Sequence, residues 1–463
     1  MEVSSSKVAV TSYDAHVQIL PCATHSWEEL YGGEIRVTMS VALNIHGPAK
    51  PLEFALYRLL DVASVQGETG RSLCFEQSVT TDPFNPRRQI NRVRIIPPAR
   101  GFGPSVRLRY RGPVCGYAEV WPYVRDHVSL EYTLLRLECL WYPVLLDHLG
   151  SIPPGFQYRL EVEVPQPLVA VCAGDLEMGT AARAGQPIYV YQMHRPTWKM
   201  TVAAGLFQER KIPGMPIALH TSTVGAANAE AMVSVLEKVA AWATNWLGPL
   251  QFEQEALRVV EIPARWGSEA GPGLVLLSRD GFPDEVDASN QWVHGCLLTA
   301  GHELLHLWGV PSRETCVSRW LDEGITHYLE AMLLEDFIGA HALTERMEQF
   351  RKWFVSAGPA AGRPLAEAGR AEGRDEIARG KGPWVLHVLR QVIGDEEFRS
   401  LLGGFLLAFR EKGADLTDFA EYVGKRVPVD VTRFFEDWFW GVESSSLLAS
   451  GMEPERIAAR YRS

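Results

Sequence analysis

The sequence predicts a multidomain α+β protein, in which an N-terminal all-β domain precedes a part that combines a small sheet with helices. Two patterns support this prediction. Through residues 1–205, apolar side chains alternate with polar or small ones in short runs, which is the period of a half-buried strand. After residue 205 the apolar spacing changes to that of amphipathic helices. A chain of 463 residues is also long enough for two or three domains with substantial cores.

The strands of the N-terminal β domain are expected where the alternation is regular. The clearest run is residues 35–45, where an apolar side chain occupies every second position. Similar runs occur at residues 106–110, 158–164, 188–190 and 198–202. Clusters of proline and glycine separate the runs, as turns between strands require. A detached sandwich that binds carbohydrate or a partner is the alternative for this part of the chain.

Residues 206–441 are expected to form a second domain, followed by a C-terminal tail at residues 442–463. A helical stripe fills residues 227–247, and short apolar runs at 259–262 and 274–277 predict strands. Further helices are predicted at residues 342–355, 383–393, 395–411, 415–425 and 430–440. The intervening segment, residues 356–382, is rich in alanine, glycine and charge and is expected to be a mobile loop.

The strongest chemical signal is an H-E-x-x-H motif, which runs from His302 to His306. Histidines four residues apart share one helix face, about 6 Å apart along the axis, so both imidazoles can reach one zinc ion. Glu303 then projects beside the metal, where it can accept a proton from water rather than bind the ion. The alternative, a core helix with two hydrogen-bonded histidines, would leave several buried polar groups unpaired.

Glu323 is the expected third ligand, because it opens a second amphipathic run, with sixteen residues between it and His306. Two nitrogens, one carboxylate and an open position for water form the hydrolytic arrangement of zinc rather than the closed structural one. One zinc ion per chain is therefore predicted. His327 and Glu330 follow one and two helical turns after Glu323 and are candidates for orienting the ligands. For both, a partly packed polar helix face is the alternative.

The sequence HELLHLW followed by WLDEG resembles the aminopeptidase N family of zinc metallopeptidases, of the gluzincin clan, which also contains the leukotriene hydrolase. The resemblance implies a saddle-like N-terminal β domain beside the active-site cleft and a thermolysin-like catalytic domain over residues 206–441. The spacing between the second histidine and the glutamate is shorter than the family's, which we interpret as a shortened loop. Many members continue into a large C-terminal helical domain, and none is expected here because about twenty residues follow Gly441.

One departure from the family pattern concerns the substrate's free amine, which the family binds with a glutamate in a G-x-M-E-N motif. The matching stretch has Ala270 at that position, and Glu269 lies one residue earlier, on the opposite face of a strand. A bulge at Gly271 and Gly273 would restore the orientation of Glu269. Glu269, Gly271 and Gly273 are the expected substrate-binding residues, and recognition of a free N-terminus is left open.

A second departure concerns the oxyanion of the reaction. The family has a tyrosine at the start of a Y-x-K-G motif, and its hydroxyl stabilises the tetrahedral intermediate. Arg379 stands at that position here. Losing an oxyanion donor typically lowers the rate by about 10²–10³. Three interpretations remain: Arg379 donates instead, since guanidinium is a strong charged donor; His387 donates; or the chemistry differs from peptide cleavage.

Charge and composition exclude several classes of protein. The net charge of −11 argues against nucleic-acid binding and favours a soluble protein. Seven scattered cysteines without C-x-x-C spacing indicate free thiols in a reducing compartment. The first residues show no signal-peptide pattern, and no apolar run approaches 18 residues, so membrane insertion is not expected. A cytoplasmic location is therefore predicted, and the oligomeric state is left open.

These observations together predict a zinc-dependent hydrolase, most simply an aminopeptidase-like peptidase that uses Glu303 as general base. One alternative is a zinc hydrolase that acts on a small molecule or modified peptide in a biosynthetic pathway. Another is a catalytically retired, zinc-containing scaffold or binding protein. The presence of Glu303 argues against retirement, because structural zinc binding does not need this carboxylate.

Overall fold

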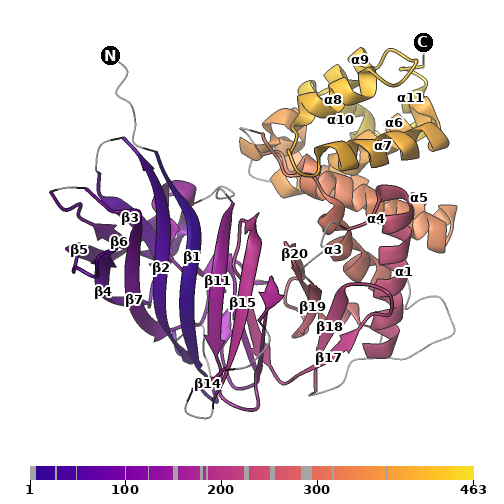
Figure 1. Cartoon of the computed structure of the whole chain (residues 1–463). Coiled ribbons are helices and arrows are strands. Elements are labelled where there is room, and N and C mark those ends of the chain that lie inside the picture. The colour runs from indigo at the N-terminus through magenta and orange to yellow at the C-terminus, as the bar shows by residue number, and fades with distance from the viewer. Residues whose placement is uncertain are drawn as a thin grey trace, which may run out of the picture. The chain divides into compact units, whose positions relative to one another are not determined.

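The computed structural model of the chain describes residues 7–462. Residues 25, 27–28, 48–49, 100, 124, 150–154, 178–180, 184–185, 224–228, 251–255, 283–294, 315–316 and 371–373 lie outside the description. The chain divides into two compact units (Figure 1). Unit 1 combines Met1–Ala227 with Gln254–Arg279, and unit 2 combines Asn228–Glu253 with Asp280–Ser463. The predicted α+β class is confirmed, since strands fill unit 1 and helices fill unit 2.

The largest sheet of unit 1 has eight strands in the order β13-β15-β11-β1-β2-β7-β4, with β14 paired to β15 (Figure 1). Its strands are β1 (Lys7–Leu20), β2 (Glu34–His46), β4 (Asp61–Gly67), β7 (Ser105–Pro113), β11 (Phe156–Glu163), β13 (Asp175–Leu176), β14 (Ala181–Arg183) and β15 (Gln186–Thr197). Buried and more exposed side chains alternate along β2, as the spacing of residues 35–45 predicts. One face of this sheet therefore contributes to the core of unit 1.

Two four-stranded sheets complete the N-terminal part of unit 1. One has the order β10-β3-β6-β5, and the other has the order β12-β16-β9-β8. Their strands are β3 (Leu52–Tyr57), β5 (Phe75–Asp82), β6 (Asn85–Ile95), β8 (His127–Val128), β9 (Tyr132–Leu135), β10 (Val144–Leu145), β12 (Val169–Cys172) and β16 (Val202–Gly205). The strand predicted at residues 198–202 is wrong for most of its length, because β16 begins only at Val202. The preceding segment instead brings Lys199 to a buried ion pair.

A five-stranded sheet in the order β17-β18-β19-β21-β20 also belongs to unit 1. It consists of β17 (Phe207–Lys211), β18 (Ile217–Ser222), β19 (Leu257–Ile262), β20 (Glu269–Gly271) and β21 (Leu274–Ser278). β18, β19 and β21 are parallel and almost entirely buried, as strands covered on both faces are. This sheet belongs to the same compact unit as the N-terminal strands. The domain boundary expected at residue 205 therefore stays a prediction.

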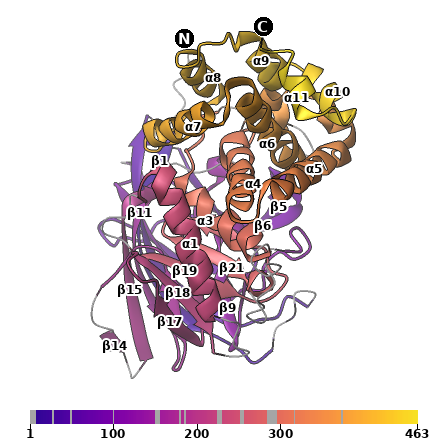
Figure 2. The same cartoon turned by 90° about the vertical axis from the view of Figure 1, so that its right-hand side faces the viewer.

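Unit 2 is helical within its described residues. Its helices are α1 (Ala229–Leu247), α3 (His302–Leu305), α4 (Ile325–Phe337), α5 (Ala340–Ser356), α6 (Arg374–Ile393), α7 (Asp395–Phe409), α8 (Leu416–Gly424), α9 (Thr432–Phe435), α10 (Glu443–Ala449) and α11 (Pro454–Ala458). α4, α5 and α6 pack against one another (Figure 2). The segment predicted as a tail contains α10 and α11, and α11 packs on α6. No helix among the described residues is both long enough and apolar enough to cross a membrane.

The mobile loop predicted for residues 356–382 is wrong, because α6 begins at Arg374 and continues through Pro383. Glycine, lysine and proline in succession suggest a loop, but here the glycines allow close packing. A Cβ atom on Gly382 would lie 2.9 Å from the Cα atom of Gly324. Trp320 then donates a hydrogen bond from Nε1 to the Gly382 carbonyl, 3.1 Å away. Tertiary contact thus overrides the local preference against helix.

Candidate metal centre

The first element of the candidate centre is a helical run over residues 295–308, which contains α3. It begins with a π-helical turn, Leu297–Gly301, a form of helix that often occurs at functional positions. Gly301 allows this run to approach α4 closely, since a Cβ atom there would lie 2.7 Å from the Leu333 side chain. The run ends at Trp308, whose buried indole donates to the Gly248 carbonyl at 2.7 Å. Gly309 follows in an extended conformation and ends the run.

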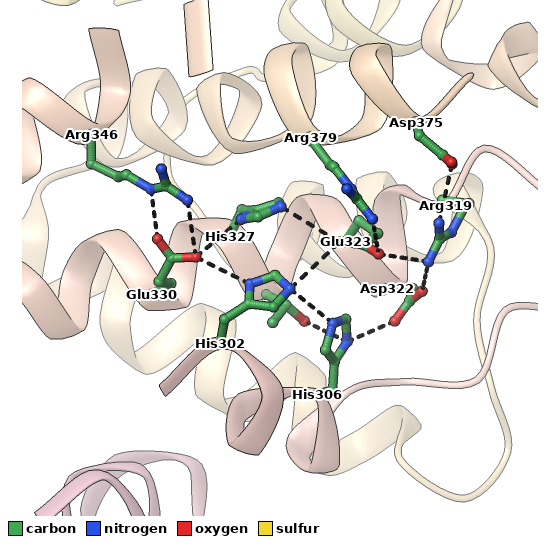
Figure 3. A network of polar contacts seen from close by, with 11 residues as sticks. His302, His306, Arg319, Asp322, Glu323, His327, Glu330, Arg346, Asp375 and Arg379 are labelled. Atoms are coloured by element: carbon green, nitrogen blue, oxygen red, sulfur yellow. Dashed lines mark hydrogen bonds and ion pairs between the residues drawn. The ribbon is translucent and has the colours of Figure 1, made fainter. Parts of the chain in front are cut away.

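The second element is a π-helical turn, Trp320–Gly324, that leads directly into α4. Arg319 precedes it with a φ of 62°, a left-handed conformation that redirects the chain into the turn. Trp320 is fully buried and anchors the turn, while Glu323 is almost fully buried beside it. Both elements present their polar side chains to the same place within unit 2 (Figure 3).

The three predicted ligands, His302, His306 and Glu323, lie together (Figure 3). The Nε2 atoms of His302 and His306 are 3.1 Å apart, and His302 Nε2 lies 3.6 Å from Glu323 Oε2. Zinc bonds of 2.0–2.1 Å in a tetrahedron place neighbouring ligand atoms about 3.3–3.4 Å apart. The buried Oε2 atom of Glu323 has no hydrogen-bond partner. These two distances are near those that a zinc ion requires, and the ligand roles themselves stay a prediction.

His327 lies closer to this cluster than the sequence analysis expected. The donor atoms of His302, Glu323 and His327 all lie within 4.8 Å of one another. The rings of His302 and His327 have centroids 4.3 Å apart. The sequence did contain a signal for this arrangement, because Glu323 and His327 are four residues apart on one helix, as the two histidines of the motif are.

Glu330 contacts two of the imidazoles at their Nδ1 atoms. Its Oε2 atom lies 3.1 Å from Nδ1 of His302 and 3.1 Å from Nδ1 of His327 (Figure 3). Arg346 donates from Nε to the other oxygen at 2.6 Å. Burial opposes ionisation of Glu330, but Arg346 and the histidines outweigh it and lower its pKa. An ionised Glu330 can therefore accept hydrogen bonds from both rings, and its role as an orienting residue stays a prediction.

Asp322 plays the corresponding part for His306, and the sequence analysis missed it. Its Oδ1 atom lies 2.8 Å from His306 Nδ1, and Thr326 Oγ1 lies 3.3 Å from the same nitrogen. Asp322 directly precedes Glu323, so the two carboxylates leave the turn toward different histidines. The only signal in the sequence was this adjacency, which does not identify the partner.

Two arginines bind the outer oxygen of Glu323. Arg319 Nη2 lies 2.6 Å and Arg379 Nη2 lies 3.0 Å from Oε1 (Figure 3). Burial alone would raise the pKa of Glu323. His302 and Arg319 have the larger, opposite effect, so the pKa of Glu323 lies well below its ordinary value. The side chain of Arg379 is 43% exposed. Arg379, the predicted oxyanion donor, thus lies beside the candidate ligand.

The histidines of the cluster differ in their affinity for a proton. Burial lowers the pKa of His302, but the nearby carboxylates of Glu323 and Glu330 raise it to about 10. Burial and the neighbouring His302 lower the pKa of His327 to about 4. The partly buried Glu303 lies on α3, and its charge is one of those that raise the pKa of His302. The predicted base thus lies at the cluster, while its role stays a prediction.

The predicted substrate residues Glu269, Gly271 and Gly273 lie in unit 1. The bulge is absent, because β20 and β21 pair in an unbroken register. Glu269 binds the Lys199 ammonium group through Oε1, and its Oε2 atom lies 3.5 Å from Arg136 Nη1. A Cβ atom on Gly271 would collide with the Lys199 side chain, and Gly273 has a φ of 76° in the β20–β21 turn. Packing against Lys199 thus favours glycine at position 271, and the positive φ favours glycine at position 273. The role of both residues in substrate binding stays a prediction.

Comparison with known proteins finds a family model that matches about a third of the chain. Residues 282–438 match the Peptidase family M1 domain. Aminopeptidase N from Haemonchus contortus is 29% identical over 164 residues, 30% of this chain and 16% of that protein. Probable aminopeptidase 2 from Sulfurisphaera tokodaii is 20% identical over 309 residues, 63% of this chain and 39% of that protein. The chain therefore spans well under half the length of these curated relatives.

A solved structure extends the similarity of fold to most of the chain. A variant of the M1 zinc metallopeptidase from Deinococcus radiodurans has a TM-score of 0.64 at 18% identity, over 93% of this chain and 94% of that one. The same metallopeptidase has been solved with Tyr-Ser-Ala as a bound substrate. This likeness shows a shared two-part fold.

Proposed function

Because the chain is a distant member of peptidase family M1, we propose that it is a zinc-dependent peptidase of the aminopeptidase type. The observation that carries the proposal is the convergence of His302, His306 and Glu323 through Nε2, Nε2 and an unpartnered Oε2. These atoms come from two helical elements of one compact unit, so their convergence does not depend on how the units are arranged.

The roles of the side chains follow from their contacts. Bound zinc would supply a Lewis acid that activates water and polarises a carbonyl group. Glu303, next to His302 on the same helix, would accept the proton of the attacking water and deliver it to the leaving amine. Glu330 and Asp322 would accept hydrogen bonds from the Nδ1–H groups of His302 and His306. The lone pair of each Nε2 atom would then be free to bind the metal.

Arg379 is the proposed oxyanion donor. Its guanidinium group binds the outer oxygen of Glu323, which fixes its position, yet its side chain is 43% exposed. A guanidinium group has five N–H donors, so one contact with Glu323 leaves others for a developing negative charge. This charged donor would replace the hydroxyl of the family's tyrosine in stabilising the tetrahedral intermediate.

A second candidate function is hydrolysis of a modified peptide or another small substrate in a biosynthetic pathway. The observation that favours it is the state of Glu269, whose two oxygens contact Lys199 and Arg136. A carboxylate neutralised by two cations attracts a substrate's ammonium group less than an unpaired one does. The retired scaffold is less favoured, because the motif retains Glu303, which structural zinc binding does not need.

The experiment that tests the proposal is hydrolysis of a peptide library with free and acetylated N-termini by the zinc-loaded protein. Wild-type protein should cleave peptides with free N-termini, and Glu303→Gln should keep its zinc while turnover falls by about 10²–10⁴. Cleavage of acetylated peptides alone would favour the second candidate. Full activity of Glu303→Gln, or no hydrolysis of either library, would contradict the proposed peptidase.

We also propose a cytoplasmic location. Cys22, Cys74, Cys115, Cys139 and Cys172 are free thiols, which supports a reducing compartment. Cys316 lies outside the described residues. Fractionation of the source cells with an antibody against this chain would test the location.

A further inference from the structure

Two buried polar atoms in unit 2 face each other without a hydrogen bond. They are Oε2 of Glu323 and Nε2 of His327, which lie 3.5 Å apart. Both side chains are almost fully buried, with exposed fractions of 5% and 7%. A buried polar group without a hydrogen-bond partner destabilises the fold, so two such atoms facing each other need a physical explanation.

The distances around these atoms form a regular series. His306 Nε2 to His302 Nε2 is 3.1 Å, and His302 Nε2 to Glu323 Oε2 is 3.6 Å. The step from Glu323 Oε2 to His327 Nε2 is 3.5 Å. All three are near the edge of about 3.3–3.4 Å that a tetrahedral zinc site requires. The donor atoms of His302, Glu323 and His327 all lie within 4.8 Å of one another, and His306 joins this group through its contact with His302.

The opposite nitrogen of each ring gives a second, independent observation. Nδ1 of His302 and Nδ1 of His327 both lie 3.1 Å from Glu330 Oε2, and Nδ1 of His306 lies 2.8 Å from Asp322 Oδ1. A carboxylate on Nδ1 places the proton there and leaves Nε2 with a lone pair, which is how zinc-binding histidines are commonly held. His327 therefore has the same preparation for metal binding as the two histidines of the motif (Figure 3).

We propose that His327 is a third imidazole ligand of the metal, joining His302, His306 and Glu323 through its Nε2 atom. The inference rests on the zinc of the proposed function and adds a ligand that the H-E-x-x-H motif does not contain. Three imidazoles and one carboxylate fill a tetrahedral site, whereas hydrolytic zinc sites keep one position open. His327 would then compete with water for the fourth position and hold the resting centre closed.

The alternative is that His327 only packs and orients its neighbours. Its ring contacts those of Phe350 and Trp353, with centroids 5.2 and 5.6 Å away, and it shares Glu330 with His302. Zinc affinity alone does not separate the two roles, because loss of an orienting partner also lowers affinity by about 10–100-fold. The number of imidazoles bound to the metal does separate them.

The deciding experiment is X-ray absorption at the zinc edge on the full-length, zinc-loaded protein. Three imidazoles per zinc are expected in the wild type and two in His327→Phe, which keeps an aromatic ring against Phe350 and Trp353. His341→Ala is the matched control, because His341 is an exposed histidine on α5 and its loss should leave three. Two imidazoles in the wild type would overturn the proposal, even if every variant fails to fold.

The measurement also separates this inference from the proposed function. Three imidazoles in a protein that hydrolyses neither peptide library would support the inference and contradict the peptidase. Two imidazoles in a protein that cleaves peptides would support the peptidase and overturn the inference. A chain that retains no zinc after loading would contradict both.

Discussion

Two buried or partly buried carboxylates, Glu269 in unit 1 and Glu323 in unit 2, each contact two cationic side chains, but their oxygens are used differently. On Glu269, Oε1 binds Lys199 and Oε2 lies near Arg136, so each oxygen has its own cation. On Glu323, Arg319 and Arg379 share Oε1. The other oxygen faces imidazole nitrogens and makes no hydrogen bond.

This difference shows that the number of nearby charges does not decide what a carboxylate does. Both side chains contact two cations, but only Glu323 keeps an oxygen without a hydrogen bond. The arginines on Oε1 also fix which oxygen is available, because rotating the carboxylate would break two charge-assisted hydrogen bonds. Glu269 is thus part of a structural ion cluster, and Glu323 has the position of a ligand.

The largest expected effect comes from breaking the cluster in unit 1. Arg136 and Asp126 are each 1% exposed and bond at 3.1 Å, so Arg136→Met would leave Asp126 buried without its cation. Removing one partner of such a pair typically costs about 3–5 kcal/mol. The free energy of unfolding from urea denaturation should fall by that amount.

The control for this variant is Arg94→Met, which removes a 43% exposed arginine from surface ion pairs in the same unit. Its cost should stay below about 1 kcal/mol. Equal destabilisation by the two variants would mean that Arg136 has no special structural role, and the contrast between Glu269 and Glu323 would be lost.

The next effect distinguishes the two arginines that contact Glu323, and it concerns Arg379. If Arg379 donates to the oxyanion, Arg379→Ala should lower kcat by about 10²–10³ and change KM little. Steady-state kinetics on the best peptide substrate measures both. Arg379→Lys should restore part of the rate, because it returns a charged donor without the planar fork.

Arg319 provides the matched comparison for Arg379, since it binds the same oxygen but is less exposed. Arg319→Ala should lower zinc affinity more than kcat at saturating zinc, because Arg319 also bonds Asp322 and Asp375 around the turn. Identical kinetic profiles for the two alanine variants would assign both arginines to positioning Glu323 alone.

A slightly smaller effect should follow from neutralising the two carboxylates in turn. Glu323→Gln keeps an oxygen but loses the charge, so zinc affinity should fall by about 10²-fold. Glu269→Gln should leave zinc affinity unchanged, because its oxygens contact cations of unit 1. Competition with a chromophoric chelator measures both. Equal losses in the two variants would contradict the distinction drawn between them.

The sequence predicted the part of the centre that depends on short-range geometry. The four-residue spacing of His302 and His306 fixes their common face once the helix forms. The fold class and most helices also followed from local periodicity. His327 is four residues from Glu323 and carries the same kind of signal, so its position near the ligands was within reach of the sequence.

The rest depended on contacts between distant segments. Lys199 reaches Glu269 across 70 positions of the chain, and no local pattern near Glu269 indicates a cation. Arg379 and Glu323 are 56 positions apart. The start of α6 was missed for a related reason, because Gly380 and Gly382 permit close helix packing that local propensity does not encode.

The smallest expected effect concerns a buried cation that has no carboxylate bonded to it in the described structure. Lys381 on α6 is fully buried, and its Nζ atom lies 3.4 Å from Ser445 Oγ. Burial lowers the pKa of Lys381 from its ordinary value of 10.5 to about 7. Unlike the charge of Arg136, the buried charge of Lys381 lowers the free energy of unfolding. Lys381→Met should therefore raise the free energy of unfolding at pH 7 by at least about 1 kcal/mol.

The effect of Lys381 on the free energy of unfolding should depend on pH. Between about pH 7 and 10.5 the unfolded chain holds a proton on Lys381 that the native state lacks, so the stability of the wild type rises with pH through this window. Below pH 7 both states are protonated, and the cost of burying the charge is fully present. The excess melting temperature of Lys381→Met should therefore be largest at or below pH 7 and vanish near 10.5. Lys425→Met removes an exposed lysine paired with Glu421 and should show no such trend; a constant difference for Lys381→Met would mean that burial does not shift this pKa.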